Sequence, residues 1–375
     1  MEIYLDNSAT TKVCPEAVNE MVETLTHSWG NPSSLHKKGV EASRVLENAR
    51  ARIARVFSCS PDEVYFTSSG TTANNTAIFG AVYANRRRGN RIVTTSLEHP
   101  SVNEAMKRLE EQGFEVIRLR PDKFGRFSLN DLYSVINKNT ILVSIMMVNN
   151  ELGTINPVQN IKTAVMRAGA PALIHVDAVQ AFGKIHVKPS KIGADLISVS
   201  SHKIHGPKGA GALYIKKGVR IKPYVVGGGQ ENGVFSGTEA MPNIAGFGAA
   251  AAGLGDIDAS LEKVRGVRDR FIEKVTRIPG VYINSPSDSL PYIINMSVTG
   301  LPSQTVVNSL SERGIYISAG SACKRGHDSE VLSAIGLPSD RTHSAIRISM
   351  SRFTTDEEMN ETVDAIAAAV SRIRR

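Results

Sequence analysis

The chain has 375 residues, of which 41% are hydrophobic and 21% charged, the composition of a globular protein with a large core. Its formal net charge is +8, but the basic residues are spread along the chain, so we expect no direct nucleic-acid binding. No apolar run is long enough to cross a bilayer and no signal segment is visible, so we expect no membrane association.

Cysteine usage points to a reducing compartment. The three cysteines, Cys14, Cys59 and Cys323, are scattered, and no two of them form a C-x-x-C pair. An odd and sparse count argues against a disulfide framework. We therefore expect a cytoplasmic protein.

The first 250 residues alternate between helical and strand patterns. Pro15 begins a helix with a 3.6-residue rhythm of apolar positions, and a second helix runs from about residue 36 to 57. Short β-rich runs follow, most of them separated by helical patterns, at residues 64–67, 92–95, 116–119, 141–145, 173–176 and 196–199. This alternation predicts a mostly parallel sheet with helices on both faces.

The pattern changes near residue 255. A Gly-rich stretch at 227–229 leads to an Ala/Gly-rich helix at about 241–254, which is followed by a charged helix at 261–278 and a strand at 292–297. The sequence therefore predicts an α/β fold in which a smaller C-terminal α+β domain follows the large one.

Ligands of parallel sheets bind beyond the carboxyl ends of the strands, so the segments after the strands are the ones to search for chemistry. Residues 67–74 follow one strand and open a helix, and they contain Gly70 among small hydroxyl residues. Such a segment suits a phosphate at a helix N-terminus, or it simply caps the helix.

Two further segments contain single ionisable residues. Asp177 follows the strand at 173–176, where it either caps the next helix or keeps the pyridine nitrogen of pyridoxal phosphate (PLP) protonated. Lys203 directly follows an apolar strand, a position that suits a Schiff-base lysine. His202 and His205 have no further ligands at suitable spacing, so we expect no zinc or other metal site.

Short motifs are distributed along nearly the whole chain. They are LDNSATT at 5–11, GNPSS at 30–34, NNELG at 149–153, HVDAVQ at 175–180, SSHK at 200–203, GPKG at 206–209, GTE at 237–239, SAGSAC at 318–323 and IRIS at 346–349. With these motifs the sequence resembles the cysteine desulfurases, in the class V aminotransferase group of fold-type I PLP enzymes. The resemblance implies that family's fold and its cofactor, pyridoxal 5'-phosphate.

The resemblance also implies a role for each matching residue. Lys203 would hold the cofactor by a Schiff base and move the substrate's protons. Asp177 would pair with the pyridine nitrogen, and Gln180 would hydrogen-bond the phenolic oxygen. His99 would stack on the ring and shuttle protons, although a histidine before a proline can also be a simple helix cap.

The phosphate and the substrate have their own implied sites. The phosphate would be held by Gly70, Thr71, Ser200, His202 and, from the other subunit of a homodimer, Thr238. Asn150 would touch both cofactor and substrate, and Arg347 would bind the carboxylate of L-cysteine bidentately, which suits a guanidinium better than a lysine.

Cys323 distinguishes this family from other PLP enzymes. It lies in a polar, Gly-containing stretch next to Lys324 and Arg325, two cations that favour the nucleophilic thiolate. The resemblance implies that Cys323 takes sulfur from L-cysteine as a persulfide. A lone cysteine is otherwise more often a buried apolar residue, and we keep that interpretation for Cys14 and Cys59.

Some positions depart from the usual pattern of the family. Thr72 stands where a glutamate is usual, Asn74 where an aspartate is common, and Ser201 where a glycine is usual. Asn232 and Phe235 replace the usual arginines in the stretch before Thr238. These departures affect the expected phosphate site and the expected dimer loop, but not Lys203, Asp177 or Cys323.

The sequence thus predicts a cysteine desulfurase that passes sulfur to an acceptor protein, either an iron–sulfur scaffold or a tRNA-thiolation enzyme. A selenocysteine lyase, another class V PLP enzyme and a non-catalytic scaffold remain as alternatives. We expect three parts: an N-terminal segment at 1–14 that packs with the small domain, a large PLP-binding domain at 15–255, and a small domain at 256–375 that contains the cysteine loop.

Overall fold

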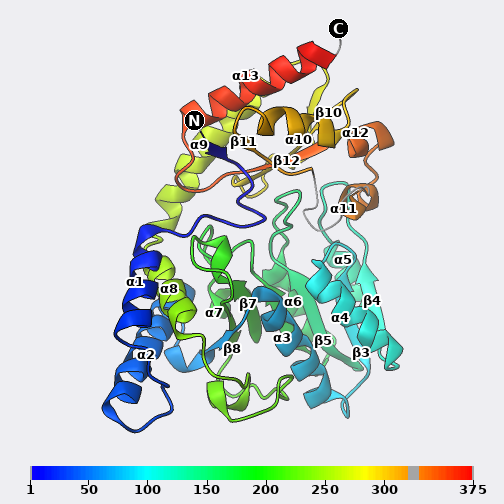
Figure 1. Ribbon diagram of the computed structural model, residues 1–375. Helices are drawn as coiled ribbons and strands as arrows, with labels where there is room; N and C mark the ends of the chain where they lie inside the picture. The colour runs from blue at the N-terminus through cyan, green and yellow to red at the C-terminus, as the bar shows by residue number, and fades with distance from the viewer. Residues whose placement is uncertain (1, 320–328, 374–375) are drawn as a thin grey trace.

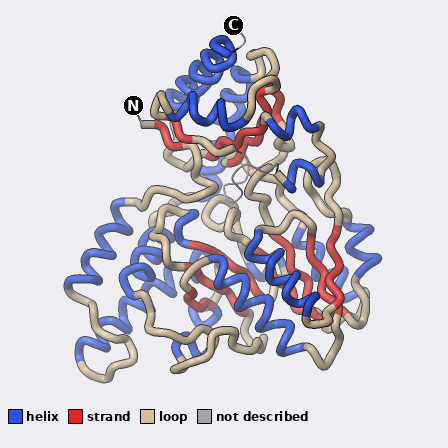
Figure 2. Tube along the Cα trace, turned by 45° about the vertical axis from the view of Figure 1, so that its right-hand side comes forward, coloured by secondary structure: helices blue, strands red, loops and turns tan. Residues whose placement is uncertain are grey.

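The computed structural model describes residues 2–319 and 329–373 of the chain. Figure 1 shows a large lower part built around one sheet and a smaller upper part, in which both termini lie. In Figure 2 the strands of the upper part are separate from those of the large lower part. Among the described residues, no helix has both the length and the apolar character needed to cross a membrane.

The large sheet contains, in the described part of the chain, seven strands in the order β2-β8-β7-β6-β5-β3-β4. Their bounds are β2 Val64–Thr67, β3 Arg91–Thr95, β4 Glu115–Leu119, β5 Thr140–Met146, β6 Leu173–Asp177, β7 Leu196–Ser200 and β8 Gly211–Ile215. Strands β3 to β7 run parallel, whereas β8 is antiparallel to both β7 and β2. The six predicted strands are confirmed, and β8 is added to them by tertiary pairing.

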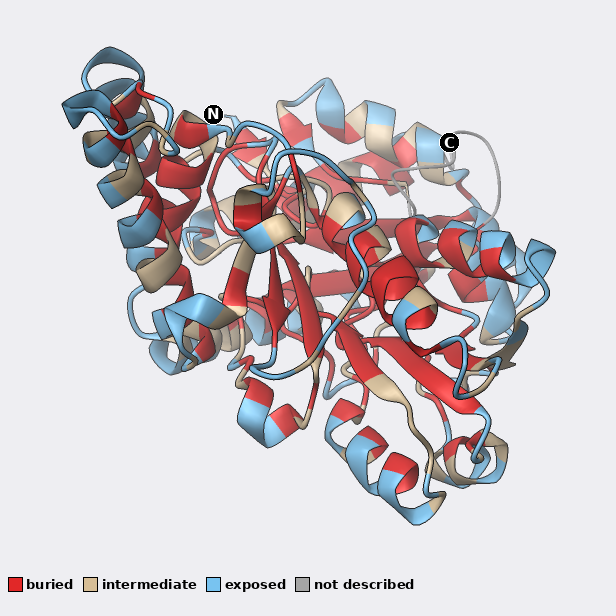
Figure 3. Ribbon diagram, turned by 90° about the horizontal axis from the view of Figure 1, so that it is seen from below, coloured by how far each residue is buried: buried red, intermediate tan, exposed pale blue. Residues whose placement is uncertain are grey.

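Side chains alternate between the two faces of this sheet, as the pleat requires. In β7, Leu196 packs with α3 (Gly70–Asn85) and α4 (Pro100–Glu111) on one face. The next residue, Ile197, packs into the core on the other face, which includes α2 (Lys37–Phe57), α6 (Ile161–Arg167) and α8 (Met241–Ala252). Figure 3 shows the result: buried strands lie between the helices, of which the outer ones expose one side while α3 and α8 are mostly buried. The prediction of an α/β sheet covered on both faces is confirmed.

The remaining helices of the large part surround this core. They are α1 Pro15–Thr26, α5 Leu129–Val135 and α7 Pro189–Ile192, together with the 3-10 turns η1 Pro61–Glu63, η2 Val158–Asn160, η3 Ser201–Lys203 and η4 Gln230–Gly233. Pro15 occupies the first position of α1, as predicted, because its missing N–H is not needed there. The apolar stripe of α1, in contrast, faces outward: Val18, Val22 and Leu25 are all exposed.

The upper part has its own antiparallel sheet, in the order β12-β10-β9. The strands are β9 Val281–Ile283, β10 Ile293–Val298 and β12 Ala345–Ser349, and the helices are α9 Ile257–Val275, α10 Ser303–Ser311, α11 Glu330–Ala334, α12 Ser339–His343 and α13 Asp356–Ile373. The N-terminal strand β1 (Ile3–Tyr4) pairs in parallel with β11 (Ile315–Tyr316). The predicted α+β character of this part is confirmed.

The division of the chain into 1–14, 15–255 and 256–375 remains our proposal. It is supported by the pairing of β1 with β11, which attaches the first residues to the upper part, and by α9, which begins at Ile257. Below β1, the N-terminal segment continues toward the sheet, where Thr11 N–H donates to His202 O at 3.0 Å. This segment therefore contacts both parts of the molecule.

Candidate active site

A cavity of about 510 Å³ lies at the carboxyl ends of β3, β5, β6 and β7, between the large sheet and the upper part. This is the edge at which parallel sheets bind ligands. The cavity is lined by the N-terminus of α3, the start of α4, the N-terminal segment at Ser8 and Ala9, and Arg347 of β12. Residues from far-apart stretches of the sequence thus meet around one space.

Lys203 enters the cavity from the short turn η3, which directly follows β7. Its Nζ donates to the backbone carbonyls of Ser8 and Ala9, at 2.6 and 2.8 Å. The chain turns back sharply here to form β8, and a Cβ at Gly206 would lie 2.1 Å from Ser201 Oγ. Gly206 therefore leaves room for the Ser201 hydroxyl in the turn that positions the lysine amine.

Asp177, the last residue of β6, is buried at the floor of the cavity. Its Oδ1 accepts a hydrogen bond from Val179 N–H at 2.9 Å, and its Oδ2 accepts one from Asn74 Nδ2 at 2.7 Å. The bond from Val179 N–H is the short backbone contact expected of a cap. The second carboxylate oxygen, Oδ2, instead binds the side chain of Asn74, which lines the cavity. A carboxylate in this position can stabilise a protonated nitrogen of a ligand.

That network continues from Asp177 to His99. Asn74 Nδ2 also donates to Ser101 Oγ at 2.9 Å, and Ser101 Oγ lies 2.8 Å from His99 Nδ1. The backbone N–H of Ser101 donates to the same Nδ1 at 3.1 Å, so in the neutral ring the proton sits on Nε2. Burial lowers the pKa of His99, a shift that Lys203 reinforces and Asp177 opposes. His99 is therefore a neutral imidazole with a fixed tautomer at pH 7.

The N-terminus of α3 forms another wall. Ser69 caps the helix by accepting from Thr72 N–H at 3.1 Å, while Thr72 Oγ1 accepts from Ser69 N–H at 2.9 Å. Thr72 thereby completes the reciprocal cap that a glutamate makes in other proteins. Next to it, a Cβ on Gly70 would come within 3.1 Å of Ser200 Cβ, so glycine leaves room for this close approach of the helix start to β7. Ser200 Oγ is buried and has no hydrogen-bond partner among the described residues.

His202 lies beside this wall and contacts the N-terminal segment. Its Nδ1 is 3.2 Å from Thr10 Oγ1. Burial lowers the pKa of His202 to about 4, and the cation of Lys203 contributes to the shift. At neutral pH the ring is therefore uncharged, and it keeps one N–H for hydrogen bonding.

Both the nitrogen and the oxygen of the Gln180 side-chain amide are hydrogen-bonded. Its Nε2 donates to Ser8 O at 3.0 Å, and its Oε1 accepts from Lys184 Nζ at 3.1 Å. Lys184 is buried, and burial together with the Lys203 and Arg347 cations lowers its pKa to about 7. Sequence reasoning missed Lys184; its place four residues after Gln180 was the available signal.

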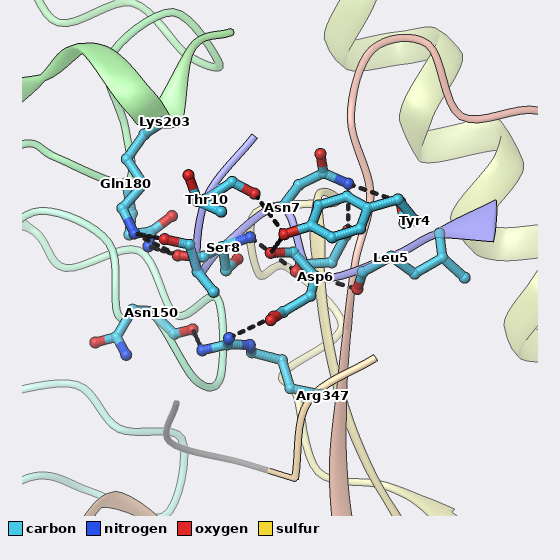
Figure 4. Close-up of polar contacts among 12 residues, drawn as sticks. Tyr4, Leu5, Asp6, Asn7, Ser8, Thr10, Asn150, Gln180, Lys203 and Arg347 are labelled. Carbon is cyan, nitrogen blue, oxygen red and sulfur yellow. Dashed lines mark hydrogen bonds and ion pairs between the residues drawn. The ribbon is translucent and has the colours of Figure 1, made fainter. Parts of the chain in front are cut away.

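Arg347 reaches the cavity from β12 with only 1% of its side chain exposed. Its Nη1 donates to Asn150 O at 3.0 Å, and its Nη2 pairs with Asp6 Oδ1 at 2.8 Å. Figure 4 shows the guanidinium between these two residues, with Lys203 and Gln180 both directed at Ser8. A buried guanidinium with several N–H donors is suited to binding a carboxylate.

The cavity brings together ten of the twelve predicted site residues: Gly70, Thr71, His99, Asn150, Asp177, Gln180, Ser200, His202, Lys203 and Arg347. Thr238 is exposed and is not among the residues that line the cavity. Cys323 lies outside the described residues.

Glu98 is a further cavity residue that sequence reasoning did not single out. It is buried next to His99, and its Oε1 accepts from Thr95 Oγ1 at 2.7 Å and from Met146 N–H at 3.1 Å. Burial, with a smaller contribution from Asp177, raises the pKa of Glu98 to about 8. The side chain is therefore mostly protonated at neutral pH. Its position directly before the predicted His99 was the only signal in the sequence.

Comparison with known proteins agrees with this geometry. Residues 3–361 match the model of the family "Aminotransferase class-V". The chain belongs to this family. The predicted resemblance and fold type are thereby confirmed, and the family is one of PLP-dependent enzymes.

Individual relatives are similar over nearly their whole length. A curated protein named "Cysteine desulfurase IscS", from Dictyoglomus turgidum, is 40% identical over 378 residues, which cover 100% of this chain and 95% of the relative. A solved structure of a "NifS-like protein" has a TM-score of 0.94 at 36% identity and covers 99% of this chain and 100% of its own. A structure described as "SspA in complex with cysteine" has a TM-score of 0.83 at 31% identity, with coverages of 95% and 100%.

Proposed function

We propose that this protein is a PLP-dependent cysteine desulfurase, which converts L-cysteine to L-alanine and transfers the sulfur to its own Cys323. The observation that supports this most directly is the convergence of Lys203, Asp177 and Arg347 on one cavity. An amine, a carboxylate and a guanidinium are the groups that a PLP enzyme needs for cofactor attachment, electron withdrawal and substrate binding. The relatives named as cysteine desulfurases and the neighbour solved with cysteine support the choice of substrate.

The residues present fit the cofactor. Ser200 Oγ, buried without a partner among the described residues, is a donor that a phosphate oxygen would satisfy. Beside it, the first turn of α3 offers backbone N–H groups at Gly70 and Thr71, where the helix dipole favours an anion. We assign the phosphate to these three residues and His202, the pyridine nitrogen to Asp177, and the aldehyde carbon to Lys203.

Bound PLP would supply an electron sink for the negative charge left when the substrate loses its Cα proton. The chain's own residues would do the rest. Arg347 and Asn150 would bind and orient the substrate carboxylate, and the Lys203 amine would take up the Cα proton. His99, with its proton fixed on Nε2 by Ser101, would stack on the ring and donate a proton from that atom.

The sulfur step balances without an added oxidant. The Cys323 thiolate would attack the substrate sulfur, forming an S–S bond while the Cβ–S bond breaks and its electron pair stays on carbon. Cβ then takes up a proton and becomes the methyl group of L-alanine, Cα takes a proton back from Lys203, and Cys323 is left as a persulfide. Lys324 and Arg325, next to Cys323 in the sequence, favour the thiolate needed for this attack.

We further propose a homodimer. Large apolar side chains of α1 and of the loop after it are exposed: Val18 44%, Val22 53%, Leu25 59%, Trp29 64% and Leu35 98%. Exposed large apolar side chains on one helix and the loop after it are typical of an interface. In such a dimer, Thr238, exposed in its own chain, would reach the phosphate of the other subunit. Its loop is anchored by Glu231, which receives two guanidinium hydrogen bonds from Arg50 at 2.8 and 2.9 Å.

The persulfide would be passed to an acceptor protein in the cytoplasm, either an iron–sulfur scaffold or a tRNA-thiolation enzyme. Several curated relatives carry the name IscS. The sparse cysteines support a reducing compartment.

Incubation of the purified protein with L-cysteine tests the proposal. Equal amounts of alanine and of persulfide or sulfide are expected, and the absence of alanine would contradict it. Parallel incubation with selenocysteine separates a desulfurase from a selenocysteine lyase, which would act on selenocysteine alone. Lys203→Ala should remove both the activity and the lysine that borohydride reduction labels; a label on Lys208 would instead contradict the assignment of Lys203.

A further inference from the structure

Arg347 has a carboxylate partner within the chain itself. Its Nη2 lies 2.8 Å from Asp6 Oδ1, and the two side chains are 1% and 21% exposed, respectively. A guanidinium buried this deeply needs a nearby anion, because removing a charge from water is costly unless it is paired. Asp6 supplies that anion at the position where Arg347 faces the cavity (Figure 4).

The other N–H donors of Arg347 determine how a second carboxylate could bind to it. Nη1 donates to Asn150 O at 3.0 Å, whereas Nε is buried and has no hydrogen-bond partner among the described residues. A carboxylate binds a guanidinium best through two parallel N–H···O bonds, and Nε and Nη2 form one such edge. One nitrogen of that edge, Nε, is therefore unpaired among the described residues, and the other already binds Asp6.

Asp6 is also part of the turn that holds Lys203. The carbonyl of Asp6 accepts from Ala9 N–H at 3.0 Å and from Thr10 N–H at 3.3 Å, which closes the turn. Within it, the carbonyls of Ser8 and Ala9 accept from Lys203 Nζ at 2.6 and 2.8 Å. A displacement of Asp6 would therefore move the carbonyls of Ser8 and Ala9, which accept hydrogen bonds from the lysine amine.

We propose that Asp6 is a built-in substitute for the substrate carboxylate. It neutralises Arg347 until an amino acid binds, and the carboxylate of that amino acid then displaces it from Nη2. The displacement loosens the turn at residues 6–10, whose Ser8 and Ala9 carbonyls bind the Lys203 amine when no cofactor is attached to it. This inference rests on the proposed binding of the substrate carboxylate by Arg347.

The proposal predicts that Asp6 weakens amino-acid binding, the opposite of what a residue that merely positions Arg347 would do. Asp6→Asn keeps the size of the side chain and its oxygen acceptor but removes the competing charge. In the cofactor-loaded protein, calorimetry with L-alanine should show about tenfold tighter binding, because no carboxylate at position 6 then competes for Nη2. Binding of L-alaninamide, which has no carboxylate, should not change.

Asp356→Asn is the matched control, since Asp356 makes an exposed ion pair with Arg270 at 2.8 Å, away from the cavity. This variant should leave L-alanine binding as in the wild type. Unchanged or weaker L-alanine binding by Asp6→Asn would overturn the proposal. Arg347→Ala tests the underlying assignment separately: if L-alanine binding survived in it, the role of Arg347 would be wrong, whatever the result for Asp6.

Hydrogen–deuterium exchange on the unmodified, cofactor-loaded protein gives a second measurement, which does not depend on the folding of a variant. Saturating L-alanine should accelerate amide exchange of the turn, including Ala9 and Thr10, and L-alaninamide should not. Unchanged or slower exchange with L-alanine would contradict the displacement of Asp6.

Discussion

Replacement of the buried Lys184 by methionine should stabilise the protein in a pH-dependent way. Lys184 lies behind the cavity, where its Nζ donates to Gln180 Oε1 at 3.1 Å and lies 6.0 Å from the centre of the Tyr292 ring. In the described residues no carboxylate is paired with this amine. Methionine replaces the apolar stem of lysine, from Cβ to Cε, and has no charge to bury.

The size of the stability change follows from the pKa of Lys184. Burial lowers the pKa of Lys184 from 10.5 to about 7, so at pH 6 both the folded and the unfolded chain bind the proton and the folded protein bears the full cost of the buried cation. That cost is about 5 kcal/mol. Between pH 7 and 10.5 the unfolded chain binds more protons than the folded one, so the stability of the wild type rises with pH. The cost falls to about 2 kcal/mol at pH 9.

Lys184→Met should therefore be more stable than the wild type at pH 6, and this advantage should shrink by about 3 kcal/mol by pH 9. The lost hydrogen bond to Gln180 subtracts about 1 kcal/mol at every pH. Urea unfolding of the cofactor-free proteins, monitored by circular dichroism at several pH values, measures the difference. Lys191→Met, at an exposed position, is the control and should show no trend with pH. A difference for Lys184→Met that did not vary with pH would refute the reasoning.

Three further variants are informative. Asp177→Asn should retain PLP but lose at least about a hundredfold in turnover, because the electron sink weakens while the other contacts remain. Near-normal turnover would show that Asp177 only caps the helical turn after β6. Cys323→Ser should bind PLP and L-cysteine, and the binding should change the visible absorption. Mass spectrometry should detect no persulfide, since an alcohol is a poor nucleophile toward sulfur. Full desulfuration by this variant would refute the mechanism. In the wild type, burial raises the pKa of Glu98 to about 8, so its stability should fall between pH 4.5 and 8 as the unfolded chain loses this proton first. Glu98→Gln should lack that fall, gaining about 3 kcal/mol on the wild type between pH 5 and 8, and parallel pH curves would contradict it.

The sequence predicted the elements with a strong local signal. Runs of β-branched and apolar residues identified six strands, and Pro15 marked the start of α1, because backbone preference and side-chain periodicity are properties of the local chain. Strand β8 was missed, since Gly211–Ile215 becomes a strand by pairing between β2 and β7. The charged helix was expected at 261–278 but spans Ile257–Val275, because Asp256 caps its start by accepting from Asp258 and Ala259 N–H.

In the candidate active site, too, some features were determined by the sequence and others only by the tertiary structure. The sequence by itself determined which residues could do the chemistry, because Lys203 and Asp177 follow strands and their motifs have a recognisable order. Only the tertiary structure decided the environment of these groups: the Asn74–Ser101 link between Asp177 and His99, the buried amine of Lys184, and the pairing of Arg347 with Asp6 across 341 residues of chain. Burial and charge proximity set the pKa of each group, and both depend on which distant segments pack together, a property that no local pattern of residues contains.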